Sequence, residues 1–506
     1  MATEIRETER KYELESGAAL PSLHDLPQVC GQSDPDEQTL EAEYYDTADL
    51  RLIRAGVTLR RRRGGTDAGW HLKLPLDSDS RREIQVPLGR TGRRVPAELS
   101  VLVRAYARGG VLRPVALITT TRHLRVLLDG AGASLAEVMT DDVSAQTLGE
   151  STILSQWREV EVELTGGGPD LLRAADRRLR HSGLRPAGHS AKLERALADQ
   201  LPAAQGAPRL AAQSTAGDVV LAYARAQVAL LPALDPLIRR DEPGSVHDMR
   251  VATRRLRSTL KTFGEILGLP DGSSLRAELK WLGGVLGGAR DNQVLSSDLQ
   301  GRLARQPAEL VVGPVQARVQ AHFAPRAASA RTALLEALDS QRYILLLNAL
   351  DQFLSSPSPT AEADLPAEDV LPAAVRQVYR RVQKRARRAV RAPAGQAREV
   401  ALHETRKAAK DARYAAEAAS PAVGRQARRF ARRMKQLQSV LGDHHDALEA
   451  RDTALEIAMR AHLAGENAFT FGLLYESCRR DAVGLESQVT KKWEHAFRPR
   501  YSKWLR

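Results

Sequence analysis

The C-terminal part of the chain contains two copies of one pattern, and this repeat constrains the fold more than any other feature. The segment "VHDMRVATRRLRSTLKTF" (246–263) aligns with "LHETRKAAKDARYAAEAA" (402–419) at an offset of 156 residues. A second pair, "LKWLGGVLGGARDNQVL" (279–295) and "MKQLQSVLGDHHDALEA" (434–450), aligns at an offset of 155. A nearly constant offset across two separate blocks indicates a duplication. From about residue 218 onward the 3.6-residue periodicity predicts helices throughout.

The chain up to about residue 200 has a different periodicity. Short segments with alternating apolar and polar residues are separated by Gly, Asp and Pro turns, which is typical of β-strands. The strand candidates are "VTLRRRR" (57–63), "WHLKLPL" (70–76), "REIQVPL" (82–88), "HLRVLLD" (123–129) and "WREVEVEL" (157–164). Two stretches, near 95–107 and 169–182, have helical periodicity instead.

Two segments without periodicity divide the chain. "DQLPAAQGAPRLAAQSTAG" (199–217) is rich in Pro, Gly and Ala, as linkers are, and "SSPSPTAEADLPAEDVLP" (355–372) separates the helical copies. We therefore expect a multidomain protein with an α+β N-terminal part and an all-α C-terminal part. The expected division is a β-rich domain over 1–200, a linker over 201–217 and a helical domain over 218–506, with copies at about 218–354 and 373–500.

Several strand candidates carry charged rows where a half-buried strand ordinarily has apolar residues. Because side chains of a strand alternate between faces, one face of "ETERK" (7–11) presents two glutamates and a lysine. One face of "WREVEVEL" presents three glutamates opposite Val and Leu. The rows comprise Glu7, Glu9 and Lys11; Glu159, Glu161 and Glu163; Arg60 and Arg62; and Lys73. A closed sheet with such charges inside would surround a water-filled tunnel rather than an apolar core.

The chemistry of these rows indicates a ligand for the tunnel. Clustered carboxylates repel one another unless a hard divalent cation lies between them, and Mg²⁺ or Mn²⁺ takes oxygen ligands while leaving room for substrate phosphate. Guanidinium and ammonium groups across the tunnel would bind the phosphate oxygens. Together these features predict a metal-assisted site for cleaving phosphoanhydride bonds.

The two helical copies carry matching cationic rows. The spacing puts each row on one helical face: His247, Arg250, Arg254, Arg257 and Lys261 in the first copy, and His403, Arg406, Lys410 and Arg413 in the second. A solvated helix face normally mixes charges of both signs, whereas these rows are almost purely cationic. The segment 376–413 holds thirteen basic residues against three acidic ones. The rows therefore predict a polyanionic ligand.

Composition narrows the choice of polyanion and of compartment. The net charge of +13 favours a polyanion, but only 4% of the residues are aromatic, which counts against single-stranded nucleic acid. Charges from residue 4 onward argue against a signal peptide, and apolar stretches such as "YILLLNAL" (343–350) are too short to span a bilayer. The two cysteines lack CxxC spacing, which favours a reducing compartment. We expect a soluble cytoplasmic protein without a membrane partner.

Five ordered motifs in the first 200 residues resemble the CYTH domain, the triphosphate tunnel metalloenzyme fold, which is an antiparallel barrel. The motifs are Glu7-x-Glu9-x-Lys11, "YYDTADLRLIRAGVTLRRRR" (44–63), "WHLKLP" (70–75), "WREVEVEL" and "GHSAKLERAL" (188–197). The resemblance implies Mg²⁺ or Mn²⁺ as cofactor, held by Glu7, Glu9, Asp141, Glu161 and Glu163. It also implies triphosphate binding by Lys11, Arg60, Arg62, Lys73, Arg122 and Lys192.

Two of these assignments choose between neighbouring residues. "TDDVS" (140–144) offers Asp141 or Asp142, and we take Asp141. "ITTTRHLRV" (118–126) offers Arg122 and Arg125, and we take Arg122. We assign the catalytic roles to Lys73 and Glu83.

The helical half resembles the CHAD domain, an all-helical duplication commonly joined to CYTH. The resemblance implies inorganic polyphosphate as the ligand of the two cationic rows. We also expect an association with polyphosphate granules. We therefore expect a polyphosphate-binding protein with an inorganic triphosphatase domain.

Other functions remain open at this point. One is a scaffold that binds polyphosphate without catalysis. A second is activity on a nucleoside or thiamine triphosphate, adenylate cyclase included, although the sequence shows no Gly-rich nucleotide loop. A third is nucleic-acid binding, which the charge favours and the aromatic content disfavours.

Overall fold

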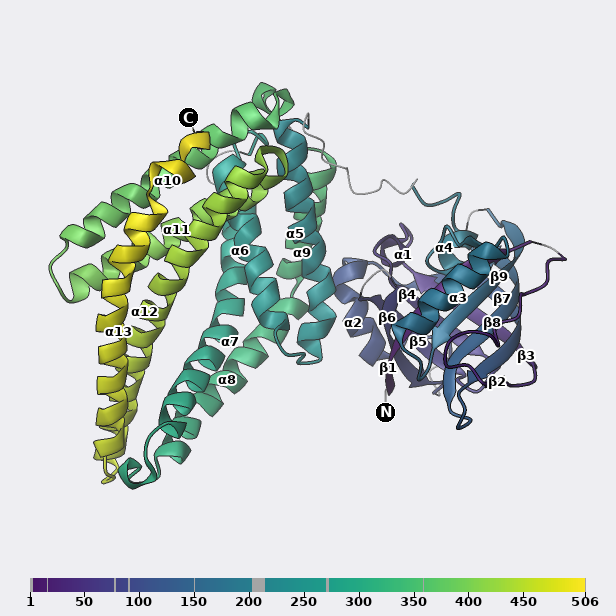
Figure 1. Cartoon of the computed structure of the whole chain (residues 1–506), viewed down its shortest axis with the longest axis horizontal. Coiled ribbons are helices and arrows are strands. Elements are labelled where there is room, and N and C mark those ends of the chain that lie inside the picture. Colours follow the sequence, from purple (N-terminus) through teal and green to yellow (C-terminus); the bar gives the residue numbers. More distant parts are fainter. Residues whose placement is uncertain are drawn as a thin grey trace. The chain divides into compact units, whose positions relative to one another are not determined.

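The computed structural model describes residues 3–15, 17–76, 79–89, 92–149, 151–202, 214–269, 273–357 and 359–505. The chain divides into two compact units, Met1–Gln205 and Gly206–Arg506 (Figure 1). Most of the predicted linker, residues 203–213, lies outside the described residues.

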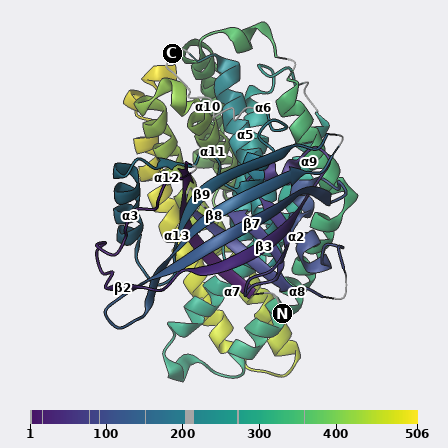
Figure 2. The same ribbon diagram turned by 90° about the vertical axis from the view of Figure 1, so that its right-hand side faces the viewer.

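The first unit is a closed antiparallel barrel. In the part of the chain that the structure describes, its long strands are β1 (Thr3–Leu14), β3 (Asp36–Asp46), β4 (Thr58–Arg63), β5 (Gly69–Pro75), β6 (Ser80–Pro87), β7 (Arg113–Leu128), β8 (Ser134–Thr147) and β9 (Leu154–Leu164). They follow the order β1-β6-β5-β4-β3-β7-β8-β9, and pairing of β1 with β9 closes the ring. The short strands β2 (Gly31–Gln32) and β10 (Arg185–Pro186) pair with β7 and β1. Figure 2 shows β3, β7, β8 and β9 side by side. The predicted barrel is confirmed.

Alternation alone did not identify every strand. β3 and β8 were not among the strand candidates, and β7 begins at Arg113, well before the predicted segment. In β3 the register shifts between Tyr44 and Tyr45, so both tyrosines are buried and the period of two is broken. In β8 the adjacent acids Asp141 and Asp142 interrupt the apolar pattern.

The apolar faces of the barrel strands point outward and are covered by helices. Helix α2 (Ala97–Ala107) packs on β4, β5 and β6, where Leu59, Trp70 and Ile84 are buried. Helix α3 (Pro169–His181) packs on β1 and β9, where Tyr12 and Val160 are buried. Two shorter helices, α1 (Arg51–Arg54) and α4 (Lys192–Ala196), complete this unit. Because the apolar rows are used for this outer packing, the charged rows of the same strands lie inside.

The second unit is helical throughout, as the periodicity predicted. Its helices are α5 (Ala216–Arg239), α6 (Ser245–Phe263), α7 (Ser274–Ala304), α8 (Val315–Asp339), α9 (Gln341–Ser355), α10 (Ala367–Arg391), α11 (Gln396–Val423), α12 (Arg425–Leu463) and α13 (Phe469–Ala496). Short 3₁₀ turns are η1 (Ala308–Leu310), η2 (Ala361–Asp364), η3 (Pro499–Tyr501) and η4 (Lys503–Leu505). Figure 1 shows α5–α9 in teal to green and α10–α13 in green to yellow.

The duplication is visible in the structure. Each copy runs through four helices in the same order, α5–α8 and α10–α13, with neighbours along the chain packed together. The first helices of the copies meet at their N-termini: the Ala216 N–H donates to Leu365 O at 2.9 Å, and the Ala367 N–H donates to Ser214 O at 3.1 Å. This reciprocal pair of bonds is one link between the two copies, which also share a hydrophobic core cluster.

Helix α5 meets the length and composition criteria of a membrane-spanning helix, with a mean hydropathy of 1.2 over an 18-residue window. Half of that window is buried inside the unit, where Val220, Leu231 and Ile238 are core residues. The core helix of a soluble protein meets the same criteria. The sequence search for long apolar stretches had not singled out α5.

Candidate functional site: a charged barrel interior and a basic helical cavity

Buried charged side chains of both signs line the inside of the barrel. Glu7 and Glu9 of β1 are buried, and each contacts a lysine. Lys73 Nζ of β5 lies 2.5 Å from Glu7 Oε2, and Lys11 Nζ lies 3.2 Å from Glu9 Oε2. Lys11 also donates a hydrogen bond across the closing seam of the barrel to Glu161 of β9. The "ETERK" row therefore faces inward and meets the glutamate row of the last strand.

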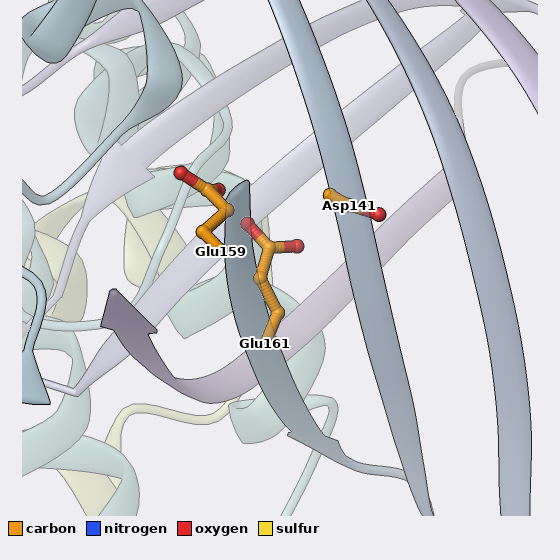
Figure 3. A group of neighbouring side chains, drawn as sticks. All are labelled: Asp141, Glu159 and Glu161. Atoms are coloured by element: carbon orange, nitrogen blue, oxygen red, sulfur yellow. The ribbon is translucent and has the colours of Figure 1, made fainter. Parts of the chain in front are cut away.

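A compact carboxylate cluster lies where β8 and β9 pair (Figure 3). Oxygens of Asp141, Glu159 and Glu161 lie within 4.8 Å of one another, and all three residues are buried. Asp141 is paired in register with Glu159, an arrangement that like charges disfavour unless cations compensate it. Two cations do so: Lys192 and Arg122.

Lys192 of α4 and Arg122 of β7 hold the cluster together. Lys192 Nζ lies 2.8 Å from Asp141 Oδ2 and 2.7 Å from an oxygen of each glutamate. Arg122 makes a two-pronged contact with Asp141, at 2.6 and 2.8 Å, and reaches Glu161 at 3.0 Å. Burial raises the pKa values of Asp141 and Glu161, but the nearby cations outweigh it and hold both below their usual range. Both side chains are therefore ionised at neutral pH.

A second group of carboxyls is less well compensated. Burial, together with a hydrogen bond to Glu83, raises the pKa of Glu7 to about 8 despite the opposing charge of Lys73. Burial and the charges of Glu9 and Glu161 raise the pKa of Glu163 to about 7, again against Lys73. The barrel thus holds more carboxyl groups than its own cations can keep ionised.

This donor set fits a hard divalent cation. Glu7 Oε2 and Glu159 Oε1 are buried and accept no hydrogen bond from the described residues; each meets an ammonium only at ion-pair distance, without hydrogen-bond geometry. Carboxylate oxygens close to further carboxyls are the ligands that Mg²⁺ and Mn²⁺ prefer. The metal candidates with direct geometric support are Asp141, Glu159 and Glu161.

The neighbouring side of the interior, on β4–β6, is rich in cations. Arg60 Nη1 donates to the Tyr44 hydroxyl at 3.3 Å, while Arg60 Nη2 lies 3.8 Å from Glu83. Burial and the charges of Arg60 and Arg122 lower the pKa of Arg62 to about 9. The buried Nε atoms of Arg60 and Arg62 have no hydrogen-bond acceptor among the described residues. The guanidinium of Arg62 also pairs with Asp67, but buried Nε donors without an acceptor fit an anion with several oxygens, such as a phosphate chain.

Glu83 and Lys73 are neighbours across β5 and β6. Burial raises the pKa of Glu83, but Lys73 and the hydrogen bond with His71 outweigh it and keep the carboxyl ionised. His71 Nδ1 lies 2.6 Å from Glu83 Oε1. Burial lowers the pKa of Lys73, but Glu83, Glu7 and Glu9 outweigh it and raise the pKa to about 12. Lys73 is therefore a fixed positive charge rather than a proton donor at neutral pH.

The structure separates the residues between which the sequence offered a choice. Asp141 points into the cluster, whereas Asp142 points the other way and pairs with Arg158 at 2.6 Å. Arg122 contacts the cluster, whereas Arg125 is exposed.

Glu159 belongs to the cluster but was not among the predicted metal ligands. The alternation in "WREVEVEL" already placed it on the face of Glu161, and its register opposite Asp141 is the additional fact that only pairing supplies. The other predicted barrel residues lie on the barrel strands, and their side chains belong to the inner face. Lys192 is the exception among them, because it extends into the barrel from α4.

A basic cavity of about 1020 Å³ lies in the helical unit between the two copies. Its walls come from α6 and α7 of the first copy and from α10, α11 and α12 of the second. Every residue of the two predicted cationic rows lines it: His247, Arg250, Arg254, Arg257, Lys261, His403, Arg406, Lys410 and Arg413. Two rows that are 156 residues apart in the sequence thus face one space.

The ends of the rows are paired with acids, and their centre is not. Arg250 contacts Asp291 at 2.6 Å, and its counterpart Arg406 lies 3.6 Å from Asp446, the counterpart of Asp291. Lys261 contacts Asp411 at 2.6 Å. The rows are therefore less purely cationic than the sequence suggested, because neighbouring helices supply acids that helical periodicity cannot show.

In the centre of the rows, Arg254 and Lys410 form no ion pair among the described residues. Burial and the charges of Arg254, Arg406 and Arg250 lower the pKa of Lys410 to about 6. Burial also lowers the pKa of Arg254, with further lowering from Arg250 and Arg406. Uncompensated cations that depress one another's pKa create a strong positive potential, which a polyanion would relieve.

His403 and His445 lie against each other in the same cavity, with ring centroids 4.3 Å apart. Burial and the neighbouring His445 lower the pKa of His403 to about 4. His247, the counterpart of His403, is exposed at the cavity wall. The first histidine of each row therefore has different surroundings, although the two positions are equivalent in the repeat: His247 is exposed, and His403 packs against His445.

Comparisons with known proteins agree with this architecture. The CYTH domain family matches residues 6–191, and the CHAD domain family matches residues 222–455. "Uncharacterized protein MT2285" of Mycobacterium tuberculosis (strain CDC 1551 / Oshkosh) is 38% identical over 487 residues, which cover 93% of this chain and 92% of that protein.

Two solved structures are also similar. PptA from Streptomyces chartreusis is 22% identical with a TM-score of 0.48, covering 56% of this chain and 100% of that chain. The CHAD domain of the plant Ricinus communis is 26% identical with a TM-score of 0.45, covering 59% of this chain and 98% of that chain. By its two family matches and its full-length relative, the chain belongs to the proteins that join an N-terminal CYTH domain to a C-terminal CHAD domain.

Proposed function

We propose that this protein binds inorganic polyphosphate in the basic cavity of its helical unit and hydrolyses short inorganic triphosphate inside its barrel with Mg²⁺ or Mn²⁺. A CYTH domain points to triphosphate hydrolases or cyclases in general. The observation that carries the hydrolase proposal is that buried arginine Nε atoms without an acceptor among the described residues lie inside one closed barrel with carboxyls whose pKa is raised by burial.

The barrel residues have two kinds of role in this proposal: some bind the phosphate oxygens, and others hold the metal or fix the position of charged side chains. Arg60, Arg62 and Lys73 would bind the phosphate oxygens, and Lys11 of β1 would bind a further phosphate oxygen. A divalent cation bound by the carboxylates would neutralise charge on the phosphates and supply the acidity that bound water needs to attack. Because Lys73 stays charged, it stabilises the negative charge that develops on the leaving phosphate. Glu83 fixes Lys73 and His71 in place from the adjacent strand.

Lys192 has a second role in this proposal. Its ammonium group lies among all three carboxylates of the cluster. It would compensate their charge in the absence of metal, which keeps the folded barrel stable. When metal and substrate are present, the same ammonium can turn to a phosphate oxygen, consistent with its assignment as a triphosphate-binding residue.

Comparing substrates tests the enzymatic part. We expect metal-dependent phosphate release from tripolyphosphate to exceed release from ATP and thiamine triphosphate at equal concentration, since no base-binding loop was found in the sequence. Faster cleavage of a nucleotide would move the assignment to a nucleotide enzyme. No release from any substrate with either metal would leave a scaffold that binds polyphosphate in both units.

Competition tests the binding part. We expect long-chain polyphosphate to displace double-stranded DNA from the protein at physiological salt, because the cavity presents cations to a flexible chain and not a groove-reading surface. DNA that persists against polyphosphate of equal charge would favour a nucleic-acid partner. If polyphosphate is the ligand, we expect the protein in the cytoplasm on polyphosphate granules, which fluorescence microscopy of a tagged chain would show.

A further inference from the structure

A second basic pocket lies at the C-terminal end of the helical unit, away from the cavity between the copies. Its volume is about 700 Å³, within the ~300–1,000 Å³ range of small-ligand sites. Its cationic lining residues are Arg429, Arg432, Arg433, Arg500 and Lys503. No acidic residue lines it, and none of the five cations forms an ion pair among the described residues.

The pocket is separate from the cavity because the two use different faces of α12. A helical residue turns about 100°, so Arg429, Arg433 and Gln436 fall within one arc of roughly 60°. Lys435 and Gln438, which line the cavity, point to the other side of the helix. The opposite wall of the pocket is formed by η3 and η4, beyond the residues that the CHAD family matches.

Aromatic packing holds this wall in place. Trp504 packs edge-on against Phe430 of α12 at 5.7 Å, and Leu505 is buried. Phe497 contacts Tyr379 of α10 at 5.6 Å and Trp493 at 4.9 Å. The terminal segment is therefore anchored, and the pocket exists without a ligand.

The ring of Tyr501 in the pocket already contacts two of the cationic side chains. The guanidinium groups of Arg433 and Arg500 lie 4.7 and 4.8 Å from the centre of the Tyr501 ring. Trp504 Nε1 donates to Tyr501 O at 3.0 Å. Tyr501 thus positions two guanidiniums, which leave little of its ring open for a nucleobase to stack on. Burial together with Arg433, Arg498 and Arg500 lowers the pKa of His495 nearby, as a positive potential requires.

We propose that this pocket is a second binding site for an inorganic phosphate chain. Five cations without a carboxylate suit a polyvalent anion, and guanidinium groups bind phosphate oxygens in pairs. This inference rests on polyphosphate being the ligand of the helical unit. Because both sites use α12, a long chain can occupy the cavity and the pocket together, so affinity should rise with chain length.

Fluorescence of Trp504 gives a local readout. Tripolyphosphate in EDTA, which prevents metal-dependent cleavage, should change the emission of the full-length protein. The change should disappear in Trp504→Phe, which leaves the other tryptophans. The double variant Arg429→Gln, Arg500→Gln should weaken this binding at least tenfold, which corresponds to ~1.4 kcal/mol, because it removes two guanidinium groups that can form charge-assisted hydrogen bonds. Lys503→Gln should weaken it in the same direction without affecting folding, because the Lys503 side chain is exposed and forms no ion pair among the described residues.

Two matched variants separate the pocket from the cavity. Arg254→Gln, Arg406→Gln removes the same charge from the cavity, and Arg305→Gln, Arg480→Gln removes it from exposed positions outside both sites. Neither should change the Trp504 titration more than twofold. With long-chain polyphosphate, both the pocket and the cavity variants should bind more weakly than the exposed control.

The outcomes distinguish the pocket from the proposed function. No Trp504-dependent change, or a pocket variant that behaves like the exposed control, overturns the pocket. A cavity variant that binds long-chain polyphosphate normally while the pocket variant fails supports the pocket and overturns the cavity assignment. Displacement of tripolyphosphate by a lower concentration of a single-stranded oligonucleotide of equal charge overturns the ligand class.

Discussion

The barrel interior and the helical cavity both contain clusters of cationic side chains, but the two clusters differ in the carboxylates that surround them. In the barrel, buried cations lie against buried carboxylates, as Lys192 does against Asp141 and Glu161. In the cavity, acids pair with the ends of the rows, whereas Arg254 and Lys410 form no ion pair within the part of the chain that the structure describes. A closed interior with charges of both signs and an excess of carboxyls suits a metal and one short substrate, whereas an excess of positive charge in an open cavity suits a chain of variable length. The difference teaches that net charge alone does not describe either site.

The largest expected effect comes from the barrel. Glu161→Gln removes one carboxylate charge at nearly constant volume, and we expect tripolyphosphate hydrolysis to fall about 100-fold or more, the size of effect seen when one electrostatic stabiliser is lost. Binding of long-chain polyphosphate should stay unchanged. Glu98→Gln, at an exposed position of α2, is the control and should keep full activity. Equal loss of hydrolysis and of polyphosphate binding would show that the two units do not divide the work.

The reciprocal change is in the cavity. Arg254→Gln with Lys410→Gln removes the two central basic side chains that form no ion pair among the described residues, and we expect polyphosphate affinity to fall about 10–100-fold, from ~1.5–3 kcal/mol for a charged hydrogen bond. The kcat for tripolyphosphate should not change. Equilibrium binding and initial rates on the same preparation measure both. A fall in kcat that matches the loss of affinity would contradict the separation of the sites.

Proton uptake should distinguish the two regions further. Lys410 has a pKa of about 6 in the free protein, and a bound polyanion favours its charged form and raises that pKa. Above pH 6, binding therefore takes up a proton, so affinity should rise as the pH falls from 8 toward 6, by at most tenfold per unit. Arg250, Arg254, Arg406 and Asp446 are the charged groups that set this pKa.

Calorimetry in buffers of different ionisation enthalpy would measure the uptake. Lys410→Met should abolish it, while Lys280→Met, at an exposed position outside the cavity, should not. An affinity that is flat between pH 8 and 6 in the unaltered protein would contradict this role of Lys410.

The smallest effects test the equivalence of the two copies. A Cβ at Gly287 would lie 3.6 Å from Arg250 Nη2, and one at Gly442 would lie 3.5 Å from Arg406 Nη2, both ordinary contact distances. Gly287→Ala and Gly442→Ala should therefore each change polyphosphate affinity less than twofold. Each should raise stability by up to ~1 kcal/mol, because Gly is the weaker helix former. Thermal unfolding of both variants checks this, and opposite signs would show that the copies have diverged.

Much of this architecture could be predicted from the sequence. Charged rows on one face and apolar residues on the other, as in "WREVEVEL", indicate a barrel with charges inside, because the apolar row must meet a packing layer. The constant repeat offset indicated the duplication, and helical spacing identified the rows that line the cavity.

The sequence could not predict which side chains of different strands and helices become neighbours in the folded protein. Glu159 belongs to the carboxylate cluster because it lies opposite Asp141 in the paired strands β8 and β9. The alternation of residues along one strand does not predict which residue of the next strand lies opposite. The acids that pair with Arg250 and Arg406 come from neighbouring helices, at positions that only packing brings near. Lys192 reaches the cluster from a short helix at the end of the unit, so the number of cations around each carboxylate depended on the folded structure.

The most direct test is a ³¹P NMR spectrum of tripolyphosphate incubated with the full-length protein, with and without Mg²⁺ or Mn²⁺. We predict that the tripolyphosphate resonances give way to those of pyrophosphate and orthophosphate only when metal is present, and that Glu161→Gln leaves them intact. Unchanged tripolyphosphate in every sample, with the protein folded and polyphosphate still bound, would contradict catalysis in the barrel and leave both units as binding sites.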